Sequence, residues 1–145
     1  MKKAGKVLFV LYVLFMLYFL LFSDWYGRTG ATEDYRYNLI LFTEIRRFCQ
    51  EWEILGWESV FMNLVGNVIV FMPFGFFMSL AKGRPHFFGV IGVSLGFSFV
   101  VEVFQLFTKV GSFDVDDLLL NTLGGILGYL IFLVWRSRRR KNGKR

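Results

Sequence analysis

Four apolar stretches of this sequence are each long enough to cross a lipid bilayer as a helix, which takes about 20 residues. Hydrocarbon offers no hydrogen-bond partners, so a backbone that crosses it must satisfy its own polar groups, and a helix does this within one segment. We therefore expect an all-α membrane protein, a four-transmembrane-helix bundle that forms one domain over residues 1–145. The predicted spans are Gly5–Ser23, Val60–Ala81, His86–Thr108 and Asp117–Trp135.

Two of these stretches allow more than one interpretation. The first follows a charged start and could be a cleaved signal peptide. It ends in bulky residues without a small-residue cleavage pattern, so we interpret it as an uncleaved anchor. The second contains Pro73, which we expect to bend the helix rather than to end it.

Composition supports a membrane protein and excludes several kinds of site. Hydrophobic residues make up 55% of the chain and Phe occurs 19 times, which is more apolar surface than a soluble domain of this size can bury. Cys49 is the single cysteine and His86 the single histidine. The sequence therefore excludes an intrachain disulfide and a metal site built from His and Cys. We expect no metal and no cofactor.

The formal charge of +6 is divided unevenly among the segments outside the spans. Cytoplasmic segments of membrane proteins are enriched in Lys and Arg, and this rule places both termini in the cytoplasm. The inner segments then contain no acidic residue, and their cations are Lys2, Lys3, Lys6, Lys82, Arg84, Arg136, Arg138, Arg139, Arg140, Lys141, Lys144 and Arg145. The outer cations are Arg28, Arg36, Arg46, Arg47 and Lys109. We expect the basic tail, residues 136–145, to contact anionic lipid and not nucleic acid.

The outer loop between the first two spans, residues 24–59, contains an amphipathic pattern in its second half. Apolar residues recur there at spacings of three and four, at Leu41, Ile45, Phe48, Trp52 and Leu55. This pattern predicts an interfacial helix on the outer leaflet. A segment that caps the bundle would show the same pattern, and the two interpretations are compatible.

Polar residues in the last three spans fall on narrow stripes. In the third span they lie at Ser94, Ser98, Glu102, Gln105 and Lys109, which share one helix face. Polar side chains are costly in a membrane, so they usually face the interior of the bundle and often mark a functional site. We predict a polar, acidic pocket that opens outward, formed by Glu102, Gln105, Asn63, Asn67, Asp114, Asp117 and Asn121.

A purely structural role for these residues stays open. Asn and Gln can simply join helices, at about 0.6–2 kcal/mol for each hydrogen bond. Asp114 can cap the last span, and Asp116 and Asp117 would favour the N-terminal dipole of that helix. Glu102 is the hardest to explain by packing, so we give it a functional role.

Two pairs of glycines have the spacing of closely packed helices. They are Gly92 with Gly96 and Gly124 with Gly128. The sequence leaves open whether each pair joins helices within one bundle or between subunits, and the oligomeric state is likewise open.

Several segments resemble the VanZ-like family of integral membrane proteins. The second span carries Asn63-Leu-Val-Gly-Asn67 and then Phe71-Met-Pro73-Phe-Gly75. The second half carries Glu102-Val-Phe-Gln105, Ser112-Phe-Asp114-Val-Asp116-Asp117 and Asn121-Thr-Leu-Gly124-Gly125-Ile-Leu-Gly128, and the outer loop carries Tyr37-Asn38-Leu39-Ile40. The chain departs from the family where Gly111 replaces an arginine and Leu41 a proline. If that arginine neutralises the acids, either Lys109 substitutes for it or the site of this chain differs.

The resemblance implies a bacterial integral membrane protein, and it connects the family's namesake with resistance to the glycopeptide teicoplanin. Our first hypothesis is a non-enzymatic factor that binds an envelope lipid or a lipid-linked cell-wall precursor. The alternative is an intramembrane enzyme for a lipid-linked substrate, with Glu102 and Asp117 as acid and base, although the chain has no nucleophile motif. The third hypothesis is a small proton-coupled transporter.

Overall fold

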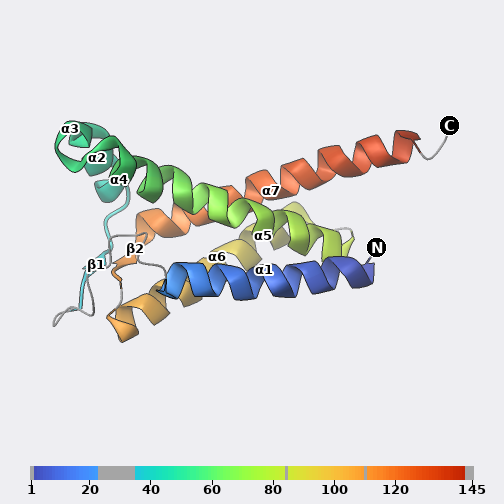
Figure 1. Ribbon diagram of the computed structural model, residues 1–145, viewed down its shortest axis with the longest axis horizontal. Coiled ribbons are helices and arrows are strands. Elements are labelled where there is room, and N and C mark those ends of the chain that lie inside the picture. Colours follow the sequence, from blue (N-terminus) through green and yellow to red (C-terminus); the bar gives the residue numbers. More distant parts are fainter. Residues whose placement is uncertain (1, 23–34, 84, 110, 143–145) are drawn as a thin grey trace.

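The computed structural model describes residues 2–22, 35–83, 85–109 and 111–142. The long helices are α1 (Lys2–Phe22), α5 (Asn67–Lys82), α6 (Phe87–Thr108) and α7 (Val115–Asn142), and they form an elongated bundle (Figure 1). A helix α4 (Trp57–Val60) and a π-helical turn η2 (Phe61–Gly66) lead directly into α5. Residues 24–34 of the predicted outer loop lie outside the described part of the chain.

Three of these helical segments are long and apolar enough to cross a membrane. They are Trp57–Lys82, Phe87–Thr108 and Val115–Asn142, and they correspond to the second, third and fourth predicted spans. Helix α1 has 21 residues, and its role as a fourth span stays a prediction. The second span continues through Pro73, as expected.

The last helix differs from its predicted bounds. It begins at Val115 and continues past Trp135 to Asn142, so the described part of the basic tail is helical. Arg and Lys have high helix propensity, and neither Gly nor Pro interrupts the chain there. The hydrophobic pattern could not show this extension because the tail contains no apolar residue after Trp135.

Helix α5 lies at the centre of the packing, between α1 and α7, and α6 packs on α7. The contact between α5 and α7 is close because glycines line it. A Cβ atom added at Gly75 would overlap the backbone of Gly125, and one added at Gly128 would overlap the carbonyl oxygen of Met72. The pair Gly124 and Gly128 therefore joins helices within the chain. Gly92 and Gly96 differ, because a Cβ atom at either would meet no heavy atom within 4 Å.

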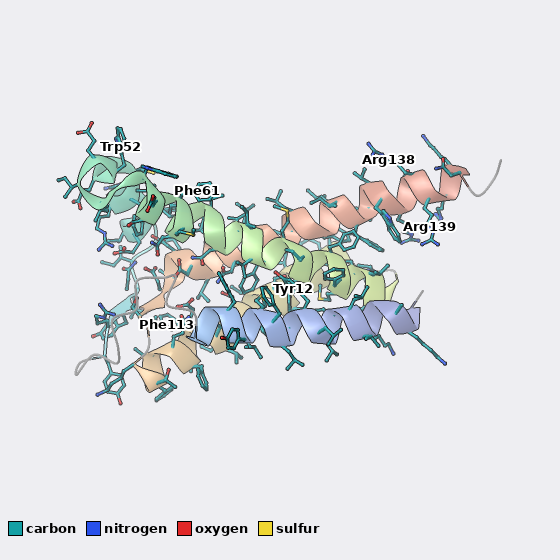
Figure 2. All side chains as sticks on the ribbon, in the orientation of Figure 1. Tyr12, Trp52, Phe61, Phe113, Arg138 and Arg139 are labelled. Carbon is teal, nitrogen blue, oxygen red and sulfur yellow. The ribbon has the colours of Figure 1, made fainter. Side chains whose placement is uncertain are left out.

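The core between these helices is largely aromatic. Phe71, Phe74 and Met78 of α5 are buried against Met16 of α1 and Phe132 of α7. Helix α1 also bonds directly to α5, because the Tyr12 hydroxyl donates a hydrogen bond to the Val70 carbonyl oxygen at 2.5 Å (Figure 2).

Short elements gather at the end of the bundle away from the two termini (Figure 1). Strand β1 (Tyr37–Asn38) pairs in parallel with β2 (Phe113–Asp114), with Tyr37 opposite Phe113 and Asn38 opposite Asp114. Helices α2 (Thr43–Gln50) and α3 (Trp52–Leu55) follow β1. This pairing joins residues far apart in the chain, between the C-terminal end of α6 and the N-terminal end of α7.

The predicted amphipathic helix of the outer loop is divided into short pieces. Phe42 is left-handed with φ 65°, so α2 begins only at Thr43, and Glu51 with φ −107° and ψ 20° separates α2 from α3. Phe48 is buried, whereas Leu41 and Trp52 are exposed. One continuous helix over these residues is therefore wrong, because turns override the periodicity. The location of this segment at a membrane interface stays a prediction.

Candidate functional site

The polar stripe of the third span faces the interior of the bundle. Ser94, Ser98, Glu102 and Gln105 are all buried on α6, and Glu102 is only 3% exposed. Its Oε2 atom accepts a hydrogen bond from the backbone N–H of Asp114 at 3.1 Å. Glu102 thus connects the C-terminal part of α6 to β2, the strand that leads into α7.

Asp114 connects the two short strands. Its Oδ1 atom accepts hydrogen bonds from the Asn38 side-chain amide at 3.1 Å and from the backbone N–H of Asp116 at 2.8 Å. Burial raises the pKa of the Asp114 carboxyl to about 6, since a charged carboxylate loses hydration there, although the bonds from Asp116 and Asn38 act in the opposite direction. The Asp114 carboxyl therefore keeps its proton to a higher pH than an ordinary aspartate does.

Asp116 is a site residue that the sequence did not reveal. We expected it to interact with the dipole of its own helix, but it is 1% exposed and directed toward α2. Its carboxylate accepts three hydrogen bonds from backbone N–H groups. The donors are Phe42, Glu44 at 2.9 Å and Ile45 at 3.1 Å. Helix α2 has no side-chain cap of its own. Asp116 supplies one from a position 74 residues away from Phe42.

Asn67 and Asp117 connect α5 with α7. The side-chain amide of Asn67 donates a hydrogen bond to Asp117 Oδ1 at 2.6 Å. Asn67 is buried, whereas Asp117 is partly exposed. Asp117 is thus more accessible than Glu102, Asp114 and Asp116.

The remaining predicted residues divide between the interior and the surface. Asn121 is buried and donates from its side-chain amide to Ser98 Oγ at 2.8 Å. Gln105 is buried, and Gly111 lies against its side chain. Asn63 is not bonded to the other predicted site residues. Its side-chain amide donates to the Ser59 carbonyl oxygen one turn earlier in its own helix. The pattern Asn63-x-x-x-Asn67 could not separate these two roles.

Comparison with known proteins identifies the family of this chain. A family model described as VanZ/LLP1 matches residues 9–136, a range that includes Glu102, Asp114, Asp116 and Asp117. The chain belongs to the VanZ/LLP1 family. It is also 31% identical over 72 residues to Protein VanZ from Enterococcus faecium, an alignment that covers 50% of this chain and 45% of that relative. The chain therefore matches less than half the length of that relative. No solved structure matches this chain.

Membership of the VanZ/LLP1 family and the three apolar segments together make this chain a multi-pass membrane protein. The departure at Gly111 also has a structural consequence. A Cβ atom there would lie 3.3 Å from Gln105 Cβ, so a larger residue at this position would press on the buried Gln105. Lys109, which could replace the missing arginine, places its Nζ atom 4.7 Å from the centre of the Tyr35 ring.

Three carboxyl groups of this site are buried and hydrogen-bonded, and a fourth is more accessible. Glu102 and Asp114 accept the backbone N–H groups of Asp114 and Asp116, which fixes their positions at the start of α7. Residues 38–45 are bonded to this region by the Asn38 amide on Asp114 and by the N–H groups that Asp116 accepts. Asp117 is the more accessible carboxyl group. We refer to Glu102, Asp114, Asp116 and Asp117 as the acidic cluster.

Proposed function

We propose that this chain is a non-enzymatic accessory protein of the bacterial cell envelope that reduces susceptibility to glycopeptide antibiotics such as teicoplanin. Family membership supports this proposal, since the resemblance connects the family's namesake with that resistance. The observation that carries it is the acidic cluster itself, which concentrates four carboxyl groups at one end of a membrane bundle. Its function would be to bind an envelope lipid or a lipid-linked cell-wall precursor through a cationic or hydrogen-bonding head group.

The hydrogen bonds of the cluster are compatible with a binding site. Glu102 Oε2 accepts the Asp114 N–H, and Asp117 Oδ1 accepts the Asn67 amide. These bonds hold both carboxylates in fixed positions from different helices, as a preformed recognition site requires. The partly exposed Asp117 is the carboxylate best placed to meet a ligand.

The proposal requires the acidic cluster to face outward from the cytoplasmic membrane, with both termini in the cytoplasm. The cations of the bundle support this orientation, because Lys82 and the arginines after Trp135 lie at the end opposite the cluster (Figure 1).

Cys49 offers a direct test of orientation, since it is exposed on α2 and is the single cysteine of the chain. A maleimide that cannot cross membranes should label Cys49 in intact cells, and Cys49→Ser should abolish the labelling. In that background Ser137→Cys should react only after the cells are permeabilised. Labelling of Ser137→Cys in intact cells would reverse the orientation and remove the basis for an outward site.

The functional test uses a strain whose teicoplanin susceptibility depends on this protein. We expect Asp117→Asn and Glu102→Gln to restore susceptibility, because each removes a carboxyl group from the cluster. Glu53→Gln is the matched control, since Glu53 is exposed on α3 and lies outside the cluster. Membrane abundance must be equal for all variants. Unchanged resistance with both cluster variants would exclude the cluster from the mechanism.

A further inference from the structure

The end of the bundle opposite the acidic cluster is strongly basic. Helix α7 extends beyond the ends of α1 and α5 there (Figure 1), and its last turns contain Arg136, Arg138, Arg139, Arg140 and Lys141. Among the described residues near this end, 2–8, 78–83, 85–90 and 130–142, none is acidic. The charged side chains of these described residues are therefore all positive.

A pocket of about 430 Å³ lies between the start of this extension and the end of α5. Its apolar lining includes Leu80, Phe132 and Trp135, and its cationic lining is Arg136, Arg139 and Arg140. These arginines fall at helical spacings of three and four, so they share one face of α7. Arg138 lies on another side of the helix, as Figure 2 shows, and it lines a different pocket.

Two contacts hold the pocket in shape. Arg136 donates from Nη1 to the Gly83 carbonyl oxygen at 3.1 Å, which joins α7 to the residue that ends α5. The Arg139 guanidinium carbon lies 5.4 Å from the centre of the Trp135 ring. A guanidinium has five N–H donors, so the bond to Gly83 leaves Arg136 with further donors for an anion.

We propose that this pocket binds the phosphate of one anionic phospholipid. Arg136, Arg139 and Arg140 would contact the phosphate, and Leu80, Phe132 and Trp135 would contact the first methylene groups below it. Because the pocket has both cationic and apolar residues, it fits the phosphate of a phospholipid better than inorganic phosphate. Its position also fits, because the membrane-length segments Trp57–Lys82 and Val115–Asn142 meet here, and tryptophan is enriched at the level of lipid head groups. This site is independent of the acidic cluster.

The test is native mass spectrometry of the full chain in detergent, titrated with phosphatidylglycerol or phosphatidylcholine. The wild type should retain one phosphatidylglycerol molecule and prefer it to phosphatidylcholine by at least about fivefold, the effect of one basic residue on an anionic lipid. The double variant Arg139→Gln, Arg140→Gln should bind phosphatidylglycerol about tenfold or more weakly. The matched control Arg138→Gln, Lys141→Gln removes equal charge outside the pocket and should stay within about twofold of the wild type.

Each alternative has a distinct result. Equal weakening in the two double variants would mean that the whole basic surface attracts lipid, and it would overturn a defined site. Displacement of the lipid by inorganic phosphate at the same concentration would assign the pocket to free phosphate. Equal retention of the two lipids would overturn the proposal entirely. Thermal unfolding midpoints check that the variants fold, and Arg139→Gln alone provides a milder second test. Antibiotic susceptibility does not enter these measurements, so they can fail independently of the proposed function.

Discussion

The side-chain amide of Asn67 on α5 donates a 2.6 Å hydrogen bond to the carboxylate of Asp117 on α7. This bond joins two membrane-length segments in the region where the acidic cluster begins. It is the polar counterpart of the glycine contact that brings α5 and α7 together further along the bundle. The position of Asp117 in the cluster therefore depends on a residue of another helix.

Asn67→Ala should destabilise the folded protein by about 0.6–1.7 kcal/mol, since it removes an interhelical hydrogen bond. The control is Asn63→Ala, which removes only a bond to the carbonyl of Ser59 in the same helix and should have a smaller effect. Unfolding in a denaturing detergent measures both. A double-mutant cycle with Asp117→Ala isolates the pair, and additive effects would show that the two side chains do not interact.

Asp116→Asn should destabilise α2 because the replacement has one acceptor oxygen where the carboxylate uses two. We expect a loss of about 2 kcal/mol, the upper range for a lost helix cap. Hydrogen exchange at the amides of Glu44 and Ile45 should become faster. Arg47→Gln, which removes the ion pair with Glu44 and the contact of the guanidinium with the Phe48 ring, should change stability by less than about 1 kcal/mol. Unchanged exchange in Asp116→Asn would contradict its role as the cap.

Asp114 should make the protein less stable as the pH rises toward neutral. Burial raises its pKa from the ordinary value of 3.8 to about 6 in the folded state, so the folded protein binds this proton more tightly than the unfolded chain does. The resulting stability is fully present below pH 3.8 and is lost as the pH rises through about 6.

Thermal unfolding between pH 4.5 and 7.5 tests this dependence, and the comparison is with Asp114→Asn. The asparagine keeps an acceptor for Asn38 and for the Asp116 N–H but cannot titrate. The variant should therefore lose less stability than the wild type over this range. Equal losses would mean that other groups produce the pH dependence.

Gly128→Ala should separate α5 from α7, because the added Cβ atom would overlap the Met72 carbonyl oxygen. Overpacking of this kind costs about 1–3 kcal/mol. Gly96→Ala is the matched control, since its Cβ atom would meet no heavy atom within 4 Å, and alanine is the better helix former by about 1 kcal/mol. Detergent unfolding should show opposite signs for the two variants. A neutral effect of Gly128→Ala would indicate a looser contact.

The sequence alone determined where the apolar segments lie and which face of α6 is buried. The length and composition of the apolar segments locate them, since a membrane-spanning helix must supply an apolar surface of that length. Helical periodicity identifies the buried face of α6, because Ser94, Ser98, Glu102 and Gln105 share one face and polar groups avoid lipid. The structure places all four in the interior.

Only the tertiary structure decided which residues meet. Helical spacing treats Asn63 and Asn67 alike and both glycine pairs alike, but the neighbouring helix reaches only Asn67 and only the pair Gly124 and Gly128. Asp114 and Asp116 each have partners more than 70 residues away, at Asn38 and the start of α2. Local patterns contain no information on such pairings, because they arise when the folded chain brings distant backbone N–H groups to a carboxylate that must be satisfied on burial.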